Sequence, residues 1–147
     1  MIARFGDDRG SSVVEFLGLS LVLLVPLVYL VLVLSRVEAA TFAAEGAARE
    51  AARTFVVADD SDEGAARAIA AAGIALRDQG FDDDPAGALT LACSASPCLA
   101  PGGDVSARID VRVPLPFVPG FVREIVPLEL PVSAERVAPV DAYRAAG

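Results

Sequence analysis

A single carboxylate, that of Glu15, stands at the mouth of a long apolar run. The run from Phe16 to Leu34 contains no charged side chain. A charged group at the centre of a bilayer costs about 3 kcal/mol, and less near its edge, so a carboxylate here indicates a function. The chemistry open to it is pairing with a cation that another group supplies. The alternative is that Glu15 merely reaches the headgroup region, where a helix macrodipole stabilises a negative charge by about 0.3 to 1 kcal/mol.

The two cysteines, Cys93 and Cys98, are the second group that could do chemistry. They bracket Ser94-Ala95-Ser96-Pro97, whose turn-forming residues bring the two thiols close together. We expect a disulfide, which forms outside the reducing cytoplasm. The sequence has no histidine and no further cysteine, so a four-ligand zinc site is not expected. The alternative is two free thiols in a cytoplasmic domain.

The acidic clusters at 59–63 and 82–84 raise the question of calcium. With Gly64 at the sixth position of an EF-hand loop, the twelfth position falls on Ala70, where a bidentate glutamate is required. We therefore predict solvated helix caps and loops, and no metal site.

Enzymatic motifs are missing as well. The chain has no histidine and no GxSxG, GxxxxGK[ST] or GxGxxG motif, so we predict no catalysis, no cofactor and no small-molecule substrate. The formal net charge is −8, and nine arginines stand against seventeen acids beyond Arg36. Such a surface argues against nucleic-acid binding.

The element that must position Glu15 is a membrane-length helix. Counted from Ser11 to Leu34 it has about 24 residues, or about 36 Å, which exceeds the bilayer core of about 30 Å. Leucine and valine cover all of its faces, which is typical of a membrane span rather than of an amphipathic surface helix. The alternative is a secretory signal with a small-residue cleavage site at Val37 to Ala39, although signal peptides have shorter apolar regions.

The residues around Glu15 resemble the processing site of type IV prepilins. A short hydrophilic leader ends in Gly10, the small Ser11 follows, and Glu15 stands at the fifth place after the glycine, before the aromatic Phe16. This is similar to the Glu-aromatic form of Flp-type prepilins and pseudopilins. The alanine-rich segment 39–53 resembles the helix of TadE-like proteins, and the two matches cover roughly residues 6–55.

The resemblance implies cleavage after Gly10 by a prepilin peptidase, with Ser11 as the new N-terminus. Glu15 would then pair with the N-terminal amine of a neighbouring subunit, since a paired charge is tolerated in a dry helical bundle and an unpaired one is not. The implied partners are membrane lipid, the prepilin peptidase, other pilin or pseudopilin subunits and the pilus assembly machinery.

Orientation is not decided by the distribution of positive charge. The leader carries two arginines, and Arg36, Arg49 and Arg53 follow the span. The processing motif and the cysteine pair favour a cytoplasmic leader and an extracytoplasmic C-terminal domain, in a single-pass protein of the cell membrane that either enters a pilus or acts only in its assembly.

The helix should continue outside the membrane to about Ala52, with a favourable pair between Glu45 and Arg49. Its alanines suit close packing against neighbouring subunits, or reflect helix propensity alone. A second helix is predicted from the N-cap Asp60, with Glu63 three residues later, to the stop at Gly80, although Gly73 interrupts it.

The last third of the chain predicts strands. The segment 88–93 is a short candidate, and 104–113 alternates cleanly, so that one face is buried. A proline-rich loop with Phe117 and Phe121 follows. The segment 127–137 alternates again through Leu128, Leu130 and Val132, and Pro131 indicates an edge strand.

The sequence thus predicts an α+β fold: a long N-terminal transmembrane helix that extends into a small exterior domain, with one further helix and a small antiparallel sheet. We assign a leader (1–10), the transmembrane helix (11–35), its extension (36–57) and the extracytoplasmic domain (58–147). A TadE-like minor pseudopilin or assembly component of a Flp, or tight-adherence, pilus is the function expected. The alternatives are an unprocessed single-span protein whose exterior domain binds an envelope partner, and a secreted soluble domain.

Overall fold

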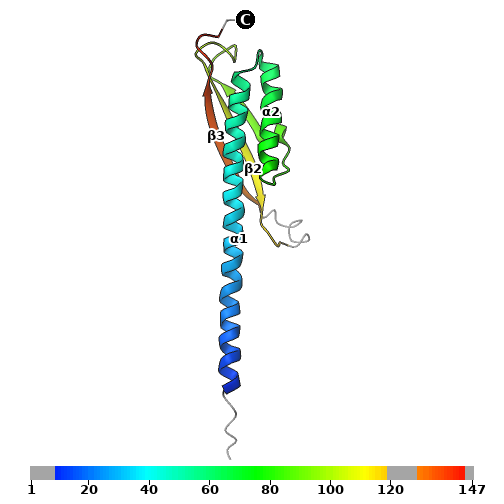
Figure 1. Ribbon diagram of the computed structural model, residues 1–147, viewed down its shortest axis with the longest axis vertical. Helices are drawn as coiled ribbons and strands as arrows, with labels where there is room; N and C mark the ends of the chain where they lie inside the picture. Colours follow the sequence, from blue (N-terminus) through cyan, green and yellow to red (C-terminus); the bar gives the residue numbers. More distant parts are fainter. Residues whose placement is uncertain (1–8, 119–128, 145–147) are drawn as a thin grey trace, which may run out of the picture. The chain divides into compact units, whose positions relative to one another are not determined.

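The computed structural model describes residues 9–118 and 129–144, so residues 1–8, 119–128 and 145–147 lie outside it. The chain divides into two compact units, Met1–Ser35 and Arg36–Gly147. The elements, in chain order, are α1 (Arg9–Val56), α2 (Ser61–Asp78), α3 (Pro85–Ala88), β1 (Leu89–Cys93), β2 (Asp104–Pro114) and β3 (Glu129–Pro139) (Figure 1). The α+β fold with a long N-terminal helix is confirmed.

Helix α1 is unbroken over 48 residues and continues through Pro26. In the first unit the leucine and valine side chains of α1 are exposed on most of the helix surface. A helix that is apolar on all of its faces needs apolar surroundings, such as lipid or a protein interior. The most apolar window of the helix has a mean hydropathy of 2.8 and is 0% buried. Length and composition therefore suit a membrane crossing, although a signal sequence has the same two properties. The helix ends at Val56, one turn beyond the predicted Ala52.

Helix α2 has the two ends that its sequence predicts. The side chain of Asp60 accepts a hydrogen bond of 2.8 Å from the backbone N–H of Glu63. At the other end Gly80 adopts a φ of 74°, and the N–H of Phe81 reaches back to the carbonyl of Leu76 over 3.1 Å. This is the pattern of a Schellman cap, which only a residue tolerant of positive φ completes without strain. Gly73 lies at a closely packed position, because an added Cβ would be only 3.1 Å from the ring of Pro85, which would have to shift slightly.

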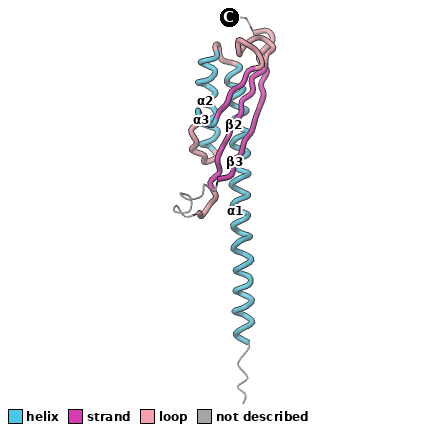
Figure 2. Tube along the Cα trace, turned by 180° about the vertical axis from the view of Figure 1, so that it is seen from behind, coloured by secondary structure: helices cyan, strands magenta, loops and turns pink. Residues whose placement is uncertain are grey.

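The three strands form one antiparallel sheet in the order β1-β2-β3. The predicted alternation of β2 is confirmed: its apolar side chains face inward and are buried, whereas Arg108, Asp110 and Arg112 are exposed. Strand β3 lies at an edge of this sheet, as Pro131 predicts. Seen from opposite sides, Figures 1 and 2 place α2 and the part of α1 that belongs to the second unit over one face of the sheet.

The core of the second unit is built on alanine. Along α1 these alanines are at most 1% exposed and belong to one cluster with Leu76, Phe81 and the inner residues of β2: Ala40, Ala43, Ala44, Ala47, Ala48, Ala51 and Ala52. Small side chains let the sheet and α2 approach the helix backbone closely. The alanine face thus packs against the chain's own domain, which neither of the two sequence interpretations anticipated.

Two details of the strands differ from the sequence expectations. Ala88 ends the short helix α3, which Asp84 caps and Pro85 begins, so β1 starts one residue later than predicted. Leu130 is 39% exposed although its partner on the neighbouring strand, Val113 of β2, is 1% exposed, and Leu130 lies on the edge strand β3. Pro127, Leu128 and Phe121 lie outside the described residues.

Candidate functional site

The predicted processing motif lies in the first turns of α1. The helix begins at Arg9, so Gly10 and Ser11 are helical, and Glu15 and Phe16 follow in the second turn. No acidic residue stands in the first turn. Because the favourable effect of the macrodipole falls off within that turn, it gives Glu15 little stabilisation. This weakens the interpretation of Glu15 as a simple headgroup-level carboxylate.

The helix surface around Glu15 is made of small side chains on two sides. Ser12 lies three residues before it and Gly18 three residues after it, so both neighbour Glu15 on the same face. A Cβ added at Gly18 would meet nothing within 4 Å in the isolated chain. Glu15 and Phe16 are themselves exposed, with Phe16 at 68%. The arrangement leaves room for the backbone of another helix next to the carboxylate.

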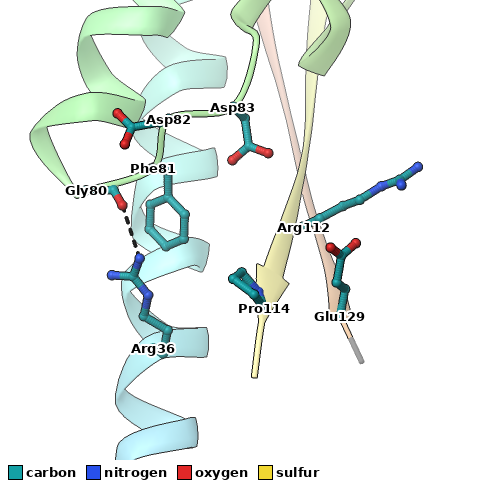
Figure 3. Close-up of a pocket in the computed structure, with 8 residues that line it drawn as sticks. All are labelled: Arg36, Gly80, Phe81, Asp82, Asp83, Arg112, Pro114 and Glu129. Atoms are coloured by element: carbon teal, nitrogen blue, oxygen red, sulfur yellow. Dashed lines mark hydrogen bonds between the residues drawn. The ribbon is translucent and has the colours of Figure 1, made fainter. Parts of the chain in front are cut away.

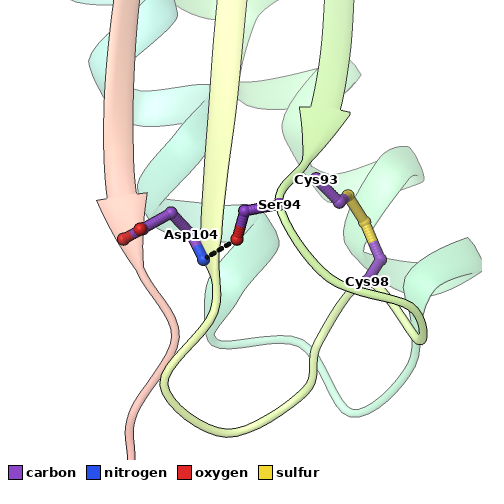
Figure 4. Close-up of a disulfide and its surroundings, with 4 residues drawn as sticks. All are labelled: Cys93, Ser94, Cys98 and Asp104. Atoms are coloured by element: carbon purple, nitrogen blue, oxygen red, sulfur yellow. Dashed lines mark hydrogen bonds between the residues drawn. A yellow bond between two sulfur atoms is a disulfide. The ribbon is translucent and has the colours of Figure 1, made fainter.

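Cys93 and Cys98 form a disulfide at the end of β1, with their Cα atoms 5.3 Å apart (Figure 4). Ser94 ties the same turn to β2, because its hydroxyl accepts a hydrogen bond of 2.8 Å from the N–H of Asp104. The Ser94 N–H donates in turn to the Asp104 carbonyl over 2.9 Å. A six-residue closed loop contributes about 2 kcal/mol in the loop-entropy model. The bridge fastens one turn and does not hold the fold together.

The acidic clusters act as helix caps. Asp60 caps α2, and Glu63 accepts from the N–H of Asp59 and binds Arg67 at 2.6 Å. Asp84 accepts from the N–H groups of Ala86 and Gly87 at the start of α3. Within the described parts of the chain, no three His, Cys, Asp or Glu residues are grouped closely enough to hold a metal ion.

A hollow of about 340 Å³ opens beside Arg36 (Figure 3). The guanidinium of Arg36 donates a hydrogen bond of 3.1 Å to the carbonyl of Gly80, and its carbon lies 4.6 Å from the centre of the Phe81 ring. The remaining lining comes from the α2–α3 connection and the ends of two strands: Asp82, Asp83, Arg112, Pro114 and Glu129. The sequence did not predict this hollow. The one signal near it is Arg36, the first charged residue after the apolar run, which marks where the run ends.

Two long-range contacts of arginine were also missed. Arg136 of β3 binds the carboxylate of Glu45 at 3.0 Å, so the partner of Glu45 is not the predicted Arg49. Arg144 donates to the carbonyls of Val56 at 3.1 Å and Asp59 at 2.7 Å, and also to that of Ala58. It thereby provides a donor for the last carbonyl of α1 and for two carbonyls that follow the helix. Neither contact has a local sequence signal.

One ionisable group on the outer face of the sheet, the guanidinium of Arg108, has a shifted pKa. The hydrogen bond from Arg108 to Asp110 and the negative charge of Asp110 raise the pKa of the Arg108 guanidinium above its ordinary value. The pair is exposed and contributes little to stability. Because arginine is protonated at every physiological pH, this shift gives the protein no pH dependence.

No protein-family model matches the chain, and no curated protein or solved structure is significantly similar to it. A long apolar N-terminal helix packed against an antiparallel sheet is nevertheless a pilin-like arrangement. What the chain does must be inferred from its own residues and geometry.

Proposed function

We propose that the chain is a TadE-like minor pseudopilin, or assembly component, of a Flp-type pilus system, processed after Gly10 and anchored by α1. The observation that carries the proposal is the segment from Gly10 to Phe16 at the start of a helix that ends inside a pilin-like domain. A processing site, a span and an exterior α+β unit in one chain are the parts that such a subunit needs. Catalysis has no role in this function.

A membrane span is favoured over a signal sequence by the residues that the domain uses. Cleavage after Ala39 would remove Arg36, which bonds to Gly80 and stacks on Phe81. It would also remove Ala39, which packs against the core, and would cut within the helix just before the buried Ala40. A secreted domain would begin in the middle of its own core helix. Retention of the apolar run avoids this loss.

Cleavage after Gly10 would create the cation that Glu15 lacks. The new α-amine of Ser11 would be positively charged at neutral pH, and Glu15 would be the fifth residue of the mature chain. Between Ser11 and Leu34 Glu15 is the sole charged residue, so we infer that its partner comes from a chain end or from another molecule. The small residues Ser12 and Gly18 give a neighbouring helix access to it.

The disulfide supports an exterior location for the C-terminal unit, because disulfides persist in oxidising compartments. The leader would then lie in the cytoplasm, where the peptidase of related systems meets its substrates. The peptidase, neighbouring subunits, the assembly machinery and lipid are the proposed partners.

The test is co-expression of the full chain with a prepilin peptidase, followed on gels by the loss of the leader. We expect the unaltered chain to be shortened and Gly10→Val to stay full length, since a β-branched residue would occupy the position before the cut bond. Gly6→Val, within the leader, is the matched control and should be cut normally. Equal processing of Gly10→Val and the unaltered chain would contradict the proposed site. An uncut chain in all three cases would favour the unprocessed single-span protein.

A further inference from the structure

The ends of several elements meet around Arg36 in the second unit. Gly80 follows the C-terminal end of α2, Pro114 ends β2 and Glu129 begins β3, and all three line the hollow beside Arg36. Figure 3 shows these residues gathered around the first charged position of the exterior part of α1. The connection between β2 and β3 therefore leaves the sheet at the level of Arg36.

Arg36 marks a depth relative to the membrane. It is the second residue after Leu34, the last apolar residue of the run, and both belong to the same unbroken helix. At 1.5 Å per residue the two are separated by about 3 Å along the axis. When the run crosses a bilayer, the strand ends beside Arg36 lie close to the bilayer surface.

The connection begins with an uncharged apolar segment, Leu115-Pro116-Phe117-Val118. Phe117 is 78% exposed, and its φ is 60°, in the left-handed region that residues other than glycine rarely occupy. An exposed aromatic side chain on a strained backbone calls for a functional explanation. Phenylalanine at the boundary of headgroups and acyl chains is favourable because its ring leaves water there.

We propose that Phe117 inserts into the interfacial region of the lipid bilayer and gives the exterior unit a second contact with the membrane, besides α1. This inference depends on the proposed membrane span. The charges that line the hollow include two arginines and three acids, Asp82, Asp83 and Glu129, so this end of the unit is not basic. The contact is apolar and does not depend on anionic lipid.

The chain has no tryptophan, so one introduced tryptophan is a sole reporter. Full-length Phe117→Trp is reconstituted at a low protein-to-lipid ratio into phosphatidylcholine vesicles that contain brominated lipid. We expect its fluorescence to be blue-shifted, quenched more by shallow than by deep bromines, and protected from iodide. Addition of phosphatidylglycerol should leave this unchanged, and a need for anionic lipid would overturn the apolar contact.

Two matched variants separate the possible outcomes. Tyr143→Trp replaces a residue that is 96% exposed and adjoins Arg144, which binds the Val56 carbonyl. Val56 is twenty residues from Arg36, about 30 Å along the helix, so this reporter should be quenched by iodide alone. Leu24→Trp, within the apolar run, should be quenched by deep bromines.

If Leu24→Trp is quenched by lipid while Phe117→Trp is as open to iodide as Tyr143→Trp, the inference is wrong and the span stands. If Phe117→Trp is shielded from both quenchers, the loop is covered by protein and the inference is wrong again. If Leu24→Trp is not quenched by lipid, the span itself fails, and the inference fails with it.

Discussion

At the scale of single residues, Glu15 is the centre of the account. It carries the sole charge between Ser12 and Leu34. It lies beyond the first turn of α1, so the helix macrodipole, whose effect falls off within that turn, gives it little stabilisation. Such a group is costly in lipid and becomes tolerable when a cation pairs with it. We therefore propose that the partner of Glu15 lies on a second chain.

Replacement of Glu15 by alanine should separate insertion from assembly. Insertion should be unchanged or improved, because a charge is removed from the apolar helix. Association of subunits should weaken by about 3 kcal/mol, roughly a hundredfold, because the partner amine is left unpaired. Cross-linking of subunits in membranes measures the effect, and Glu38→Ala, an exposed acid just beyond the span, is the control. Normal assembly of Glu15→Ala would refute the pairing.

Arg144 is a second residue whose effect can be predicted. Its guanidinium donates to the carbonyls of three residues at and after the end of α1. Arg144→Ala should lower the free energy of unfolding of the exterior unit by about 1 to 2 kcal/mol, since these acceptors are left to water alone. Thermal unfolding of the full chain in detergent, followed by circular dichroism, measures the change. Arg49→Ala, an exposed arginine on the same helix, should have less than half that effect.

At the scale of elements, one helix has two kinds of surface. In the part of α1 that belongs to the first unit, leucine and valine side chains are exposed around the helix. In the part that belongs to the second unit, one face of alanines is buried against the sheet and α2. The first surface suits lipid or other helices, and the second suits close packing within the domain. Alanine richness by itself could not reveal which partner covers it.

Overfilling the alanine face tests its assignment to the core. Ala47 is 0% exposed, so Ala47→Leu should destabilise the exterior unit by about 1 to 3 kcal/mol. Arg49→Leu, on the exposed side of the same helix, should leave stability nearly unchanged. Denaturant unfolding of the two variants makes the comparison. A fully stable Ala47→Leu that fails only in assembly would instead show that this face contacts another subunit.

The sequence predicted well those features that depend on neighbours in the chain. The caps of α2 at Asp60 and Gly80 and the alternation of β2 are local patterns, and both are confirmed. The contact of Glu45 with Arg136 and the hollow at Arg36 join segments that are far apart in sequence, so no local sequence pattern predicts them. The four residues of α3 are too few for a periodic signal.

At the scale of the whole molecule, the apolar run and part of the core belong to one helix, because α1 continues without a break from the run into the packed domain. Removal of the run at Ala39 would damage the domain, whereas removal of the leader at Gly10 would leave every described contact of the exterior unit intact. The exterior residues also carry the negative charge of the chain. Their contact with lipid should therefore be apolar rather than electrostatic.

The central claim is that trimming of the leader creates the partner of Glu15. N-terminal sequencing of the membrane-bound chain, isolated from cells that assemble pili, tests it most directly. We predict that the chain begins at Ser11 and retains the whole apolar run. Functional, assembled molecules that still begin at Met1 would contradict the account.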